Sequence, residues 1–347
     1  MAGVACVVPE AMVRNHEIVE LIDYHSRGIY DGNLRSMLTE VGAKIARTGI
    51  VSRHWRTSKE RPFALLRRAC DEALAKSGVT ASEVDFVIYA GVDRGFAEPA
   101  NACFVAKELG MRDARTFDVA DACLGWSTAT EIAQGMFASA PGAIALVVSA
   151  EFPMRPNGAV LPECFTIATH EELDWKFPAF TLGEAATASV LVGDGPAWQY
   201  SHEAHNEFAD LCSVALAPAN DYAGASARLS DEPRGSFRAY GSELALQTYK
   251  PAVRVLRDAL MGDDSPRIVF PHSVIGPYIE SVVRRVSPHL TVFSTFSDMG
   301  NVATSSLPSC VARARDQRII QPDDVPLAWV AASGLKVSAF RIVQASL

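Results

Sequence analysis

The sequence predicts an α/β fold. Helical and extended segments alternate through the first half of the chain, and several extended segments are apolar throughout, as strands buried in a layered sheet are. With 347 residues, the chain is long enough to bury a sizeable core and to form one or two domains. Its composition, 49% hydrophobic and 21% charged residues, is ordinary for a globular protein.

The first half supplies most of the α/β pattern. We expect helices at 62–76, 99–109 and 127–137, and strands at 84–90, 114–119, 144–150 and 188–193. The first helix is amphipathic, with Leu65, Leu66 and Ala69 on one face, and the second has Pro99 in its first turn. The strands at 84–90 and 144–150 are apolar rather than alternating, which indicates burial on both faces.

Between residues 153 and 180 the alternation stops. This segment contains four prolines, Trp175 and several acidic residues, and we interpret it as an insertion or lid loop. The alternation then resumes, with helices expected at 243–260, 278–286 and 304–315 and strands at 267–270, 326–331 and 336–343. The pattern favours two similar halves, residues 1–196, which carry the insertion, and residues 197–347.

Charge and composition exclude several classes of function. The net charge is −8 and no basic run interleaves with aromatic residues, so nucleic-acid binding has no electrostatic basis. No apolar stretch reaches the length of a membrane span, and the N-terminus lacks the basic region of a signal peptide. The seven cysteines are scattered without CxxC pairs, which argues against a disulfide framework and a zinc site. We expect a cytoplasmic protein with free thiols.

Cys123 is the most informative residue. It stands between the strand expected at 114–119 and the helix expected at 127–137. A thiol in the first turn of a helix meets unsatisfied N–H groups and the positive end of the helix dipole, and both favour the thiolate. Ala122 and Gly125 are small enough to let a substrate carbonyl approach. A cysteine considered alone is more often a small buried hydrophobic residue, so the hypothesis depends on residues further along the chain.

Two polar residues complete a chemically sensible set. His272 follows the strand at 267–270, and Asn301 lies in a loop before the helix at 304–315. Ligands of open α/β sheets gather at the carboxyl ends of strands. Singly, His272 fits a structural histidine and Asn301 an ordinary turn. With Cys123 they provide a nucleophile, an imidazole base or donor, and an amide that donates a hydrogen bond.

The chain resembles the β-ketoacyl-acyl-carrier-protein synthase III branch of the thiolase superfamily, in motifs that occur in order along nearly its whole length. These motifs are Val8-Pro9-Glu10, Ala46-Arg47-Thr48-Gly49-Ile50, Asp118 to Gly125, Val147 to Glu151, Phe270-Pro271-His272 and Gly300 to Pro308. The resemblance implies a five-layered αβαβα thiolase-like fold built from two similar halves, and a homodimer. It also implies ping-pong acyl transfer without a metal or other cofactor. Acyl-CoA or acyl-carrier-protein thioesters would be the substrates, and an acyl carrier protein would be a partner.

The same resemblance assigns roles to individual residues. Cys123 attacks an acyl thioester and carries the acyl group. Backbone N–H groups of Cys123, Ser333 and Gly334 form the oxyanion hole. His272 and Asn301 then hydrogen-bond a malonyl thioester and stabilise the enolate that decarboxylation produces.

Arg47, Glu98 and Trp126 are the candidate substrate-binding residues. Arg47 is retained where the family binds coenzyme A, but Ala43 replaces the tryptophan that usually accompanies it. Glu98 replaces an aromatic residue near the acyl pocket of a partner subunit, where it would suit a polar or amine-bearing acyl group. A solvated acid at the start of a helix is the alternative for Glu98. These departures point to a specialised enzyme of fatty-acid, polyketide or related secondary metabolism.

Other functions stay open at this stage. An acyltransferase of the same fold would move the acyl group from Cys123 to a hydroxyl, an amine or a carrier thiol, with His272 as the general base. A papain-like peptidase uses Cys, His and Asn in the same order, but its signature around the cysteine is absent here. An inactive partner subunit of the fold would be expected to lack the nucleophile.

Overall fold

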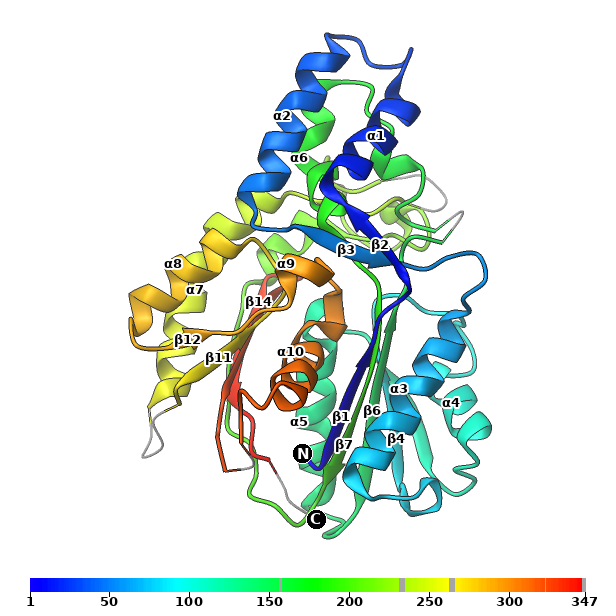
Figure 1. Ribbon diagram of the computed structural model, residues 1–347, viewed down its shortest axis with the longest axis vertical. Coiled ribbons are helices and arrows are strands. Elements are labelled where there is room, and N and C mark those ends of the chain that lie inside the picture. Colours follow the sequence, from blue (N-terminus) through cyan, green and yellow to red (C-terminus); the bar gives the residue numbers. More distant parts are fainter. Residues whose placement is uncertain (156–157, 231–234, 262–265, 322, 345–347) are drawn as a thin grey trace.

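The protein is described by a computed structural model that covers residues 1–155, 158–230, 235–261, 266–321 and 323–344. Two five-stranded sheets lie roughly face to face, with helices between them and on their outer faces (Figure 1). This gives the five αβαβα layers that the sequence predicts. A cap of helices and short strands rises above one end of the two sheets (Figure 1).

The first sheet has the strand order β1-β7-β6-β4-β5. Its strands are β1 (Gly3–Val7), β4 (Phe86–Ala90), β5 (Arg115–Val119), β6 (Ile144–Glu151) and β7 (Ala185–Val192). β4 runs parallel to β5 and β6, whereas β7 is antiparallel to both β6 and β1. Helices α3 (Pro62–Ser77) and α4 (Asn101–Leu109) cover the outer face. β4 and β6 are buried on both faces, as their apolar sequences predict.

The second sheet repeats this arrangement, with the order β12-β11-β13-β14-β8. Its strands are β8 (Tyr200–Ala204), β11 (Ile268–Pro271), β12 (Thr291–Val292), β13 (Leu327–Ala332) and β14 (Lys336–Arg341). β11 is parallel to β12 and β13, and β14 is antiparallel to β13 and β8. Helices α7 (Gly241–Leu260) and α8 (Gly276–Val286) cover the outer face. The two sheets therefore share one pattern of strand order and direction.

The central layer consists of α5 (Gly125–Phe137) and α10 (Ser306–Asp316), which lie between the sheets (Figure 1). Small buried residues such as Ala129, Ala133 and Ala314 let these helices pack closely against both sheets. One hydrophobic core thus joins the two halves of the chain. The loops that lead into α5 and α10 carry Cys123 and Asn301, so this shared layer fixes their relative positions.

The cap contains α1 (Asn15–Ser26), α2 (Leu34–Arg47) and the hairpin of β2 (Ala11–Arg14) with β3 (Ser52–Trp55). The segment at 153–180, expected to be an insertion or lid loop, forms α6 (Leu173–Lys176) and several 3₁₀ turns in the described residues. Its Phe165 and Phe180 pack with Ile22 and Val41 of the two long cap helices. It is therefore a folded part of the cap, because its aromatic residues find a core that the sequence pattern does not reveal.

Every helix and strand expected from the sequence is present, with ends that differ by at most three residues. The expectations had omitted α1, α2 and the short strands β1, β2, β3, β8 and β12. They had also omitted β9 (Cys212–Ser213), β10 (Arg238–Ala239) and α9 (Phe296–Met299). All seven cysteines are free thiols. Within the described part of the chain, we find no helix with the length and apolar character needed to span a membrane.

Candidate active site

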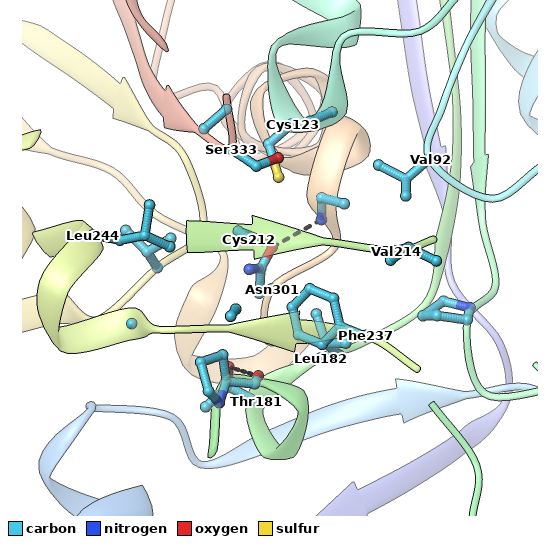
Figure 2. Close-up of a pocket in the computed structure, with 18 of the residues that line it drawn as sticks. Val92, Cys123, Thr181, Leu182, Cys212, Val214, Phe237, Leu244, Asn301 and Ser333 are labelled. Atoms are coloured by element: carbon cyan, nitrogen blue, oxygen red, sulfur yellow. Dashed lines mark hydrogen bonds between the residues drawn. The ribbon is translucent and has the colours of Figure 1, made fainter. Parts of the chain in front are cut away.

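A cavity of about 820 Å³ lies between the cap and the two sheets. Residues of both halves and of the cap line it, and Figure 2 shows several of them, including Cys123, Asn301 and Ser333. Of the residues predicted from the sequence, five line this cavity: Arg47, Cys123, His272, Asn301 and Ser333. Residues from both ends of the chain therefore share one site, since Arg47 and Ser333 both line it.

Cys123 lies in a 3₁₀ turn, Ala122–Leu124, that leads directly into α5. Ala122 has a φ of +45°, an uncommon conformation for a residue with a side chain, and this sharp turn presents the next residue to the cavity. Burial raises the pKa of the Cys123 thiol well above its usual value, and nearby Cys212 and Glu151 raise it further. The Cys123 N–H lowers the pKa by a smaller amount. The expected preference for thiolate is therefore wrong, because desolvation of Cys123 outweighs the effect of the helix terminus.

His272 follows β11 and is 4% exposed. Its Nδ1 lies 2.9 Å from the carbonyl oxygen of Ala331, which can only accept, so Nδ1 carries the proton of the neutral ring. Nε2 has no hydrogen bond of ordinary geometry in the described structure. Burial lowers the pKa of His272 to about 4, against the opposing effects of Ala331 and the neighbouring Asn301 side chain. At neutral pH the ring is thus uncharged, with an acceptor at Nε2.

Three hydrogen bonds hold Asn301 in place. Its N–H donates to Thr181 (2.8 Å), and its carbonyl oxygen accepts from the N–H of Gly183 (2.9 Å). The side-chain Oδ1 accepts from the N–H of Ala303 at 2.9 Å, drawn as a dashed line in Figure 2. This bond orients the amide so that Nδ2 is the group that can donate to a ligand.

The repeat of the fold places the Cys123 and Asn301 loops in equivalent positions. Each half has a 3₁₀ turn that begins at an alanine with φ of +45°, Ala122 or Ala303, and leads into a central helix. By this correspondence Thr304 is the counterpart of Cys123. The Thr304 hydroxyl donates to the carbonyl oxygen of Ala122 at 2.8 Å, so the two loops are joined at the nucleophile.

Three predicted residues do not line the cavity. Gly334 lies in the turn beyond Ser333, with a φ of +78°. Glu98 is exposed, in the loop before α4, and lies outside the cavity of its own chain.

Trp126 is 1% exposed in the core between the sheets, where its Nε1 donates to Ser189 at 3.0 Å. The assignment of Trp126 to substrate binding is corrected on this basis. It lies on the face of α5 that packs into the core, together with Ala129 and Ala133.

Sequence reasoning gave no role to several ionisable residues in the cavity wall, among them Cys212 and Glu151. Cys212 in β9 has a thiol that hydrogen-bonds the Ser333 side chain, and burial raises its pKa to about 12. Glu151 is the last residue of β6 and contributes a buried carboxyl group. Glu151 had a signal, since it is the first charged residue after an apolar strand. Cys212 had none, because only the pairing of β9 with β10 brings it to the site.

The chain is similar over nearly its whole length to two β-ketoacyl-[acyl-carrier-protein] synthases III. It is 25% identical over 338 residues to that of Nitratidesulfovibrio vulgaris, covering 93% of this chain and 92% of that protein. It is 27% identical over 351 residues to that of Roseiflexus castenholzii, covering 96% and 94%. No protein-family model matches the chain. The predicted resemblance is confirmed.

The fold is also that of solved proteins. A crystal structure of an OleA variant from Xanthomonas campestris, with bound lauric acid and lauroyl-CoA, has a TM-score of 0.79 to this chain at 20% sequence identity. The similarity covers 99% of this chain and 98% of the OleA chain. It confirms the predicted thiolase-like fold.

Proposed function

We propose that this protein is an acyl-thioester-dependent condensing enzyme of the β-ketoacyl-acyl-carrier-protein synthase III type. One observation carries the proposal: Cys123, His272 and Asn301, from separate loops of two similar halves, line one cavity. The similarity to β-ketoacyl synthases III over nearly the whole chain supports the same reaction class.

In the first half-reaction, Cys123 takes the acyl group from a thioester. The Cys123 proton passes to Nε2 of His272, Sγ bonds to the carbonyl carbon, and the bond from that carbon to the donor sulfur breaks. The donor thiolate then leaves and takes this proton from Nε2, which restores the neutral ring. Backbone N–H groups at Cys123 and at the Ser333–Gly334 turn are proposed to bind the oxyanion, where each such donor contributes about 3 kcal/mol.

In the second half-reaction, a malonyl thioester loses carbon dioxide and its enolate attacks the acyl group on Cys123. The enolate oxygen needs a hydrogen-bond donor, and Nδ2 of Asn301 is oriented to be one. A buried site favours the decarboxylation, because the malonyl carboxylate is poorly solvated there and its charge moves to an enolate oxygen that a hydrogen-bond donor can meet. The product is a β-ketoacyl thioester, and Cys123 leaves as a thiolate that takes a proton from His272.

Substrate delivery is proposed from the cavity walls. Lys44 and Arg47 of α2 line the cavity and would attract the phosphates of coenzyme A or of a carrier-protein prosthetic group. An OleA variant was crystallised with lauroyl-CoA, which fits an acyl-CoA donor. Glu98 is exposed in this chain, so in a homodimer it would be free to meet a partner's acyl pocket. We place the enzyme in cytoplasmic fatty-acid, polyketide or related secondary metabolism.

Simple acyl transfer is the second candidate function. The tautomer of His272 supports it, since Nδ1 holds the ring proton and Nε2 could take a proton from an attacking hydroxyl or amine. Incubation with an acyl thioester and malonyl thioester separates the two functions. Release of carbon dioxide with a β-ketoacyl product indicates condensation, whereas acyl transfer without carbon dioxide indicates the second function.

Intact-protein mass spectrometry with a panel of acyl thioesters tests the nucleophile. Wild-type protein should gain the mass of one acyl group, and Cys123→Ala should gain none. Cys212→Ala is the matched control, because it removes the other thiol of the same cavity and should still form the adduct. An adduct that persists in Cys123→Ala and disappears in Cys212→Ala would transfer the role to Cys212.

A further inference from the structure

Glu151 is a buried carboxyl group that the proposed mechanism does not use. It is 2% exposed, at the end of β6, in the wall of the cavity that holds Cys123. Its two carboxyl oxygens accept hydrogen bonds from the N–H groups of Val92 (3.0 Å) and Asp93 (3.2 Å). Burial raises its pKa to about 7, although these bonds lower it. A buried acid with a shifted pKa in the same cavity as a nucleophile indicates a functional role.

Thr304 connects Glu151 to the nucleophile turn. The Thr304 hydroxyl interacts with Glu151 and also donates its single proton to the carbonyl oxygen of Ala122 at 2.8 Å. The single hydroxyl proton can go either to the Ala122 carbonyl oxygen or to an ionised Glu151, and the second bond lowers the pKa of Glu151. Only a protonated Glu151 can donate to Thr304 while Thr304 donates to Ala122. The chain from Glu151 through Thr304 to Ala122 is therefore complete only when Glu151 is neutral. Ala122 directly precedes Cys123 and has the strained backbone of the turn.

Charge provides a second connection. Ionised Glu151 raises the pKa of Cys123, so a carboxylate and a thiolate disfavour each other across the buried cavity. The two arginines near Glu151 are committed elsewhere, since Arg155 pairs with Asp93 at 3.1 Å and Arg94 lies 3.7 Å from Asp118. Among the described residues, no lysine or arginine forms an ion pair with Glu151. Its charge is therefore not neutralised by a partner.

We propose that Glu151 is a positioning residue of the acyl-transfer site, which holds the Cys123 turn through Thr304 and restrains ionisation of Cys123. A carboxylate and a thiolate disfavour each other in this cavity, so Cys123 ionises more readily when Glu151 is neutral. A neutral Glu151 is also the form that completes the Glu151–Thr304–Ala122 chain. This inference rests on the proposed role of Cys123 as nucleophile.

Other ionisable groups around Glu151 could produce a similar pH dependence, so the test must separate them. These groups lie on several elements. They are Tyr89 of β4, Asp93 and Arg94 of the loop after β4, Cys123, Arg155 of the cap, and Glu184 directly before β7. Glu184 is the best matched control. It is a buried carboxyl with a pKa raised by burial to about 7, and it accepts from two backbone N–H groups, but it does not act on Cys123.

The test measures the rate at which iodoacetamide alkylates Cys123, from pH 6 to 10, by mass spectrometry of the Cys123 peptide. It needs no acyl substrate, so it can fail or succeed independently of the proposed reaction. Removing the like charge in Glu151→Gln should accelerate alkylation at pH 8 by about threefold or more. Glu151→Asp keeps the charge and should retain the wild-type pH profile, and Glu184→Gln should do the same. A merely structural role would change the unfolding temperature and not this profile.

A second measurement needs no variant. Wild-type Cys123 is alkylated with iodoacetamide or with iodoacetate, which leave adducts that differ by one negative charge. Glu151 should titrate at higher pH in the charged adduct, as followed by its ¹³C-carboxyl signal. The proposal is overturned if Glu151→Gln matches wild type, if Glu184→Gln accelerates alkylation equally, or if both adducts titrate alike.

Discussion

Acid should destabilise this protein through His272, and the variant His272→Asn isolates the effect. Burial lowers the pKa of the folded imidazole from 6.5 to about 4. Between these values the unfolded chain binds a proton that the folded protein excludes, so stability rises with pH across this window. The penalty is absent above pH 6.5, grows as the pH falls, and is complete below about pH 4. Asparagine has no proton to gain, so the variant lacks this dependence.

The size of the effect follows from the two pKa values. Their difference of 2.5 corresponds to about 3.4 kcal/mol, at about 1.4 kcal/mol for each tenfold change in proton affinity. At pH 4.5 the folded ring is still mostly neutral, and about 2.5 kcal/mol of the penalty is present. The constant cost of replacing the side chain cancels when one protein is compared with itself at two pH values. Titration of the buried carboxyl groups cancels between wild type and variant.

Urea unfolding at pH 7.5 and pH 4.5 measures this difference. Wild type should lose about 2.5 kcal/mol more of its free energy of unfolding than His272→Asn between these two conditions. Equal losses in the two proteins would refute a buried neutral His272, and with it the assignment of Nε2 as a proton acceptor. A larger loss in the variant would reverse the sign of the reasoning.

Two further predictions concern residues that support the site. In Gly183→Ala the added Cβ would lie 1.9 Å from the Met299 carbonyl oxygen, so the loop that carries Asn301 must move. Acylation of Cys123 should persist while condensation slows about tenfold or more, as measured by intact mass and product formation. Glu184 has a pKa raised by burial from 4.5 to about 7, so its favourable contribution is complete below pH 4.5 and is lost as the pH rises through 7. Glu184→Gln should therefore gain about 2 kcal/mol relative to wild type between pH 5 and pH 8 in urea unfolding; no gain would contradict its burial as an acid.

The sheets could be predicted because their strands carry local signals, whereas the cap could not. β4 and β6 are apolar over their whole length, which only burial on both faces explains. The cap helices α1 and α2 instead pack on the segment at 153–180. That segment has no periodic pattern, and its prolines are typical of a loop. Its fold depends on contacts with residues more than 100 positions away, which no local pattern records.

The site was predicted where chemistry coincides with the end of a strand and missed where it depends on tertiary contacts. Cys123 and His272 each follow a strand of the sheet. Trp126 was wrongly assigned to substrate binding. Its spacing from Ala129 and Ala133, three and seven positions further along, indicates that all three lie on one buried face of the helix. Cys212 reaches the cavity through a two-residue strand, which is too short to leave a pattern.

The two proposed half-reactions need His272 first as a proton acceptor and then as a hydrogen-bond donor, and its geometry allows both. Attack by Cys123 needs a proton acceptor, which the neutral ring offers at Nε2 because Nδ1 donates to Ala331. As the enolate forms in the second half-reaction, Nε2 takes up a proton from solvent and becomes a donor, and a donor is what an enolate oxygen needs. The cost of a charged imidazole in this buried site is offset only while an anion faces it. His272 should therefore hold its second proton only in the presence of a thiolate, an oxyanion or an enolate, which confines the proton to the steps that use it.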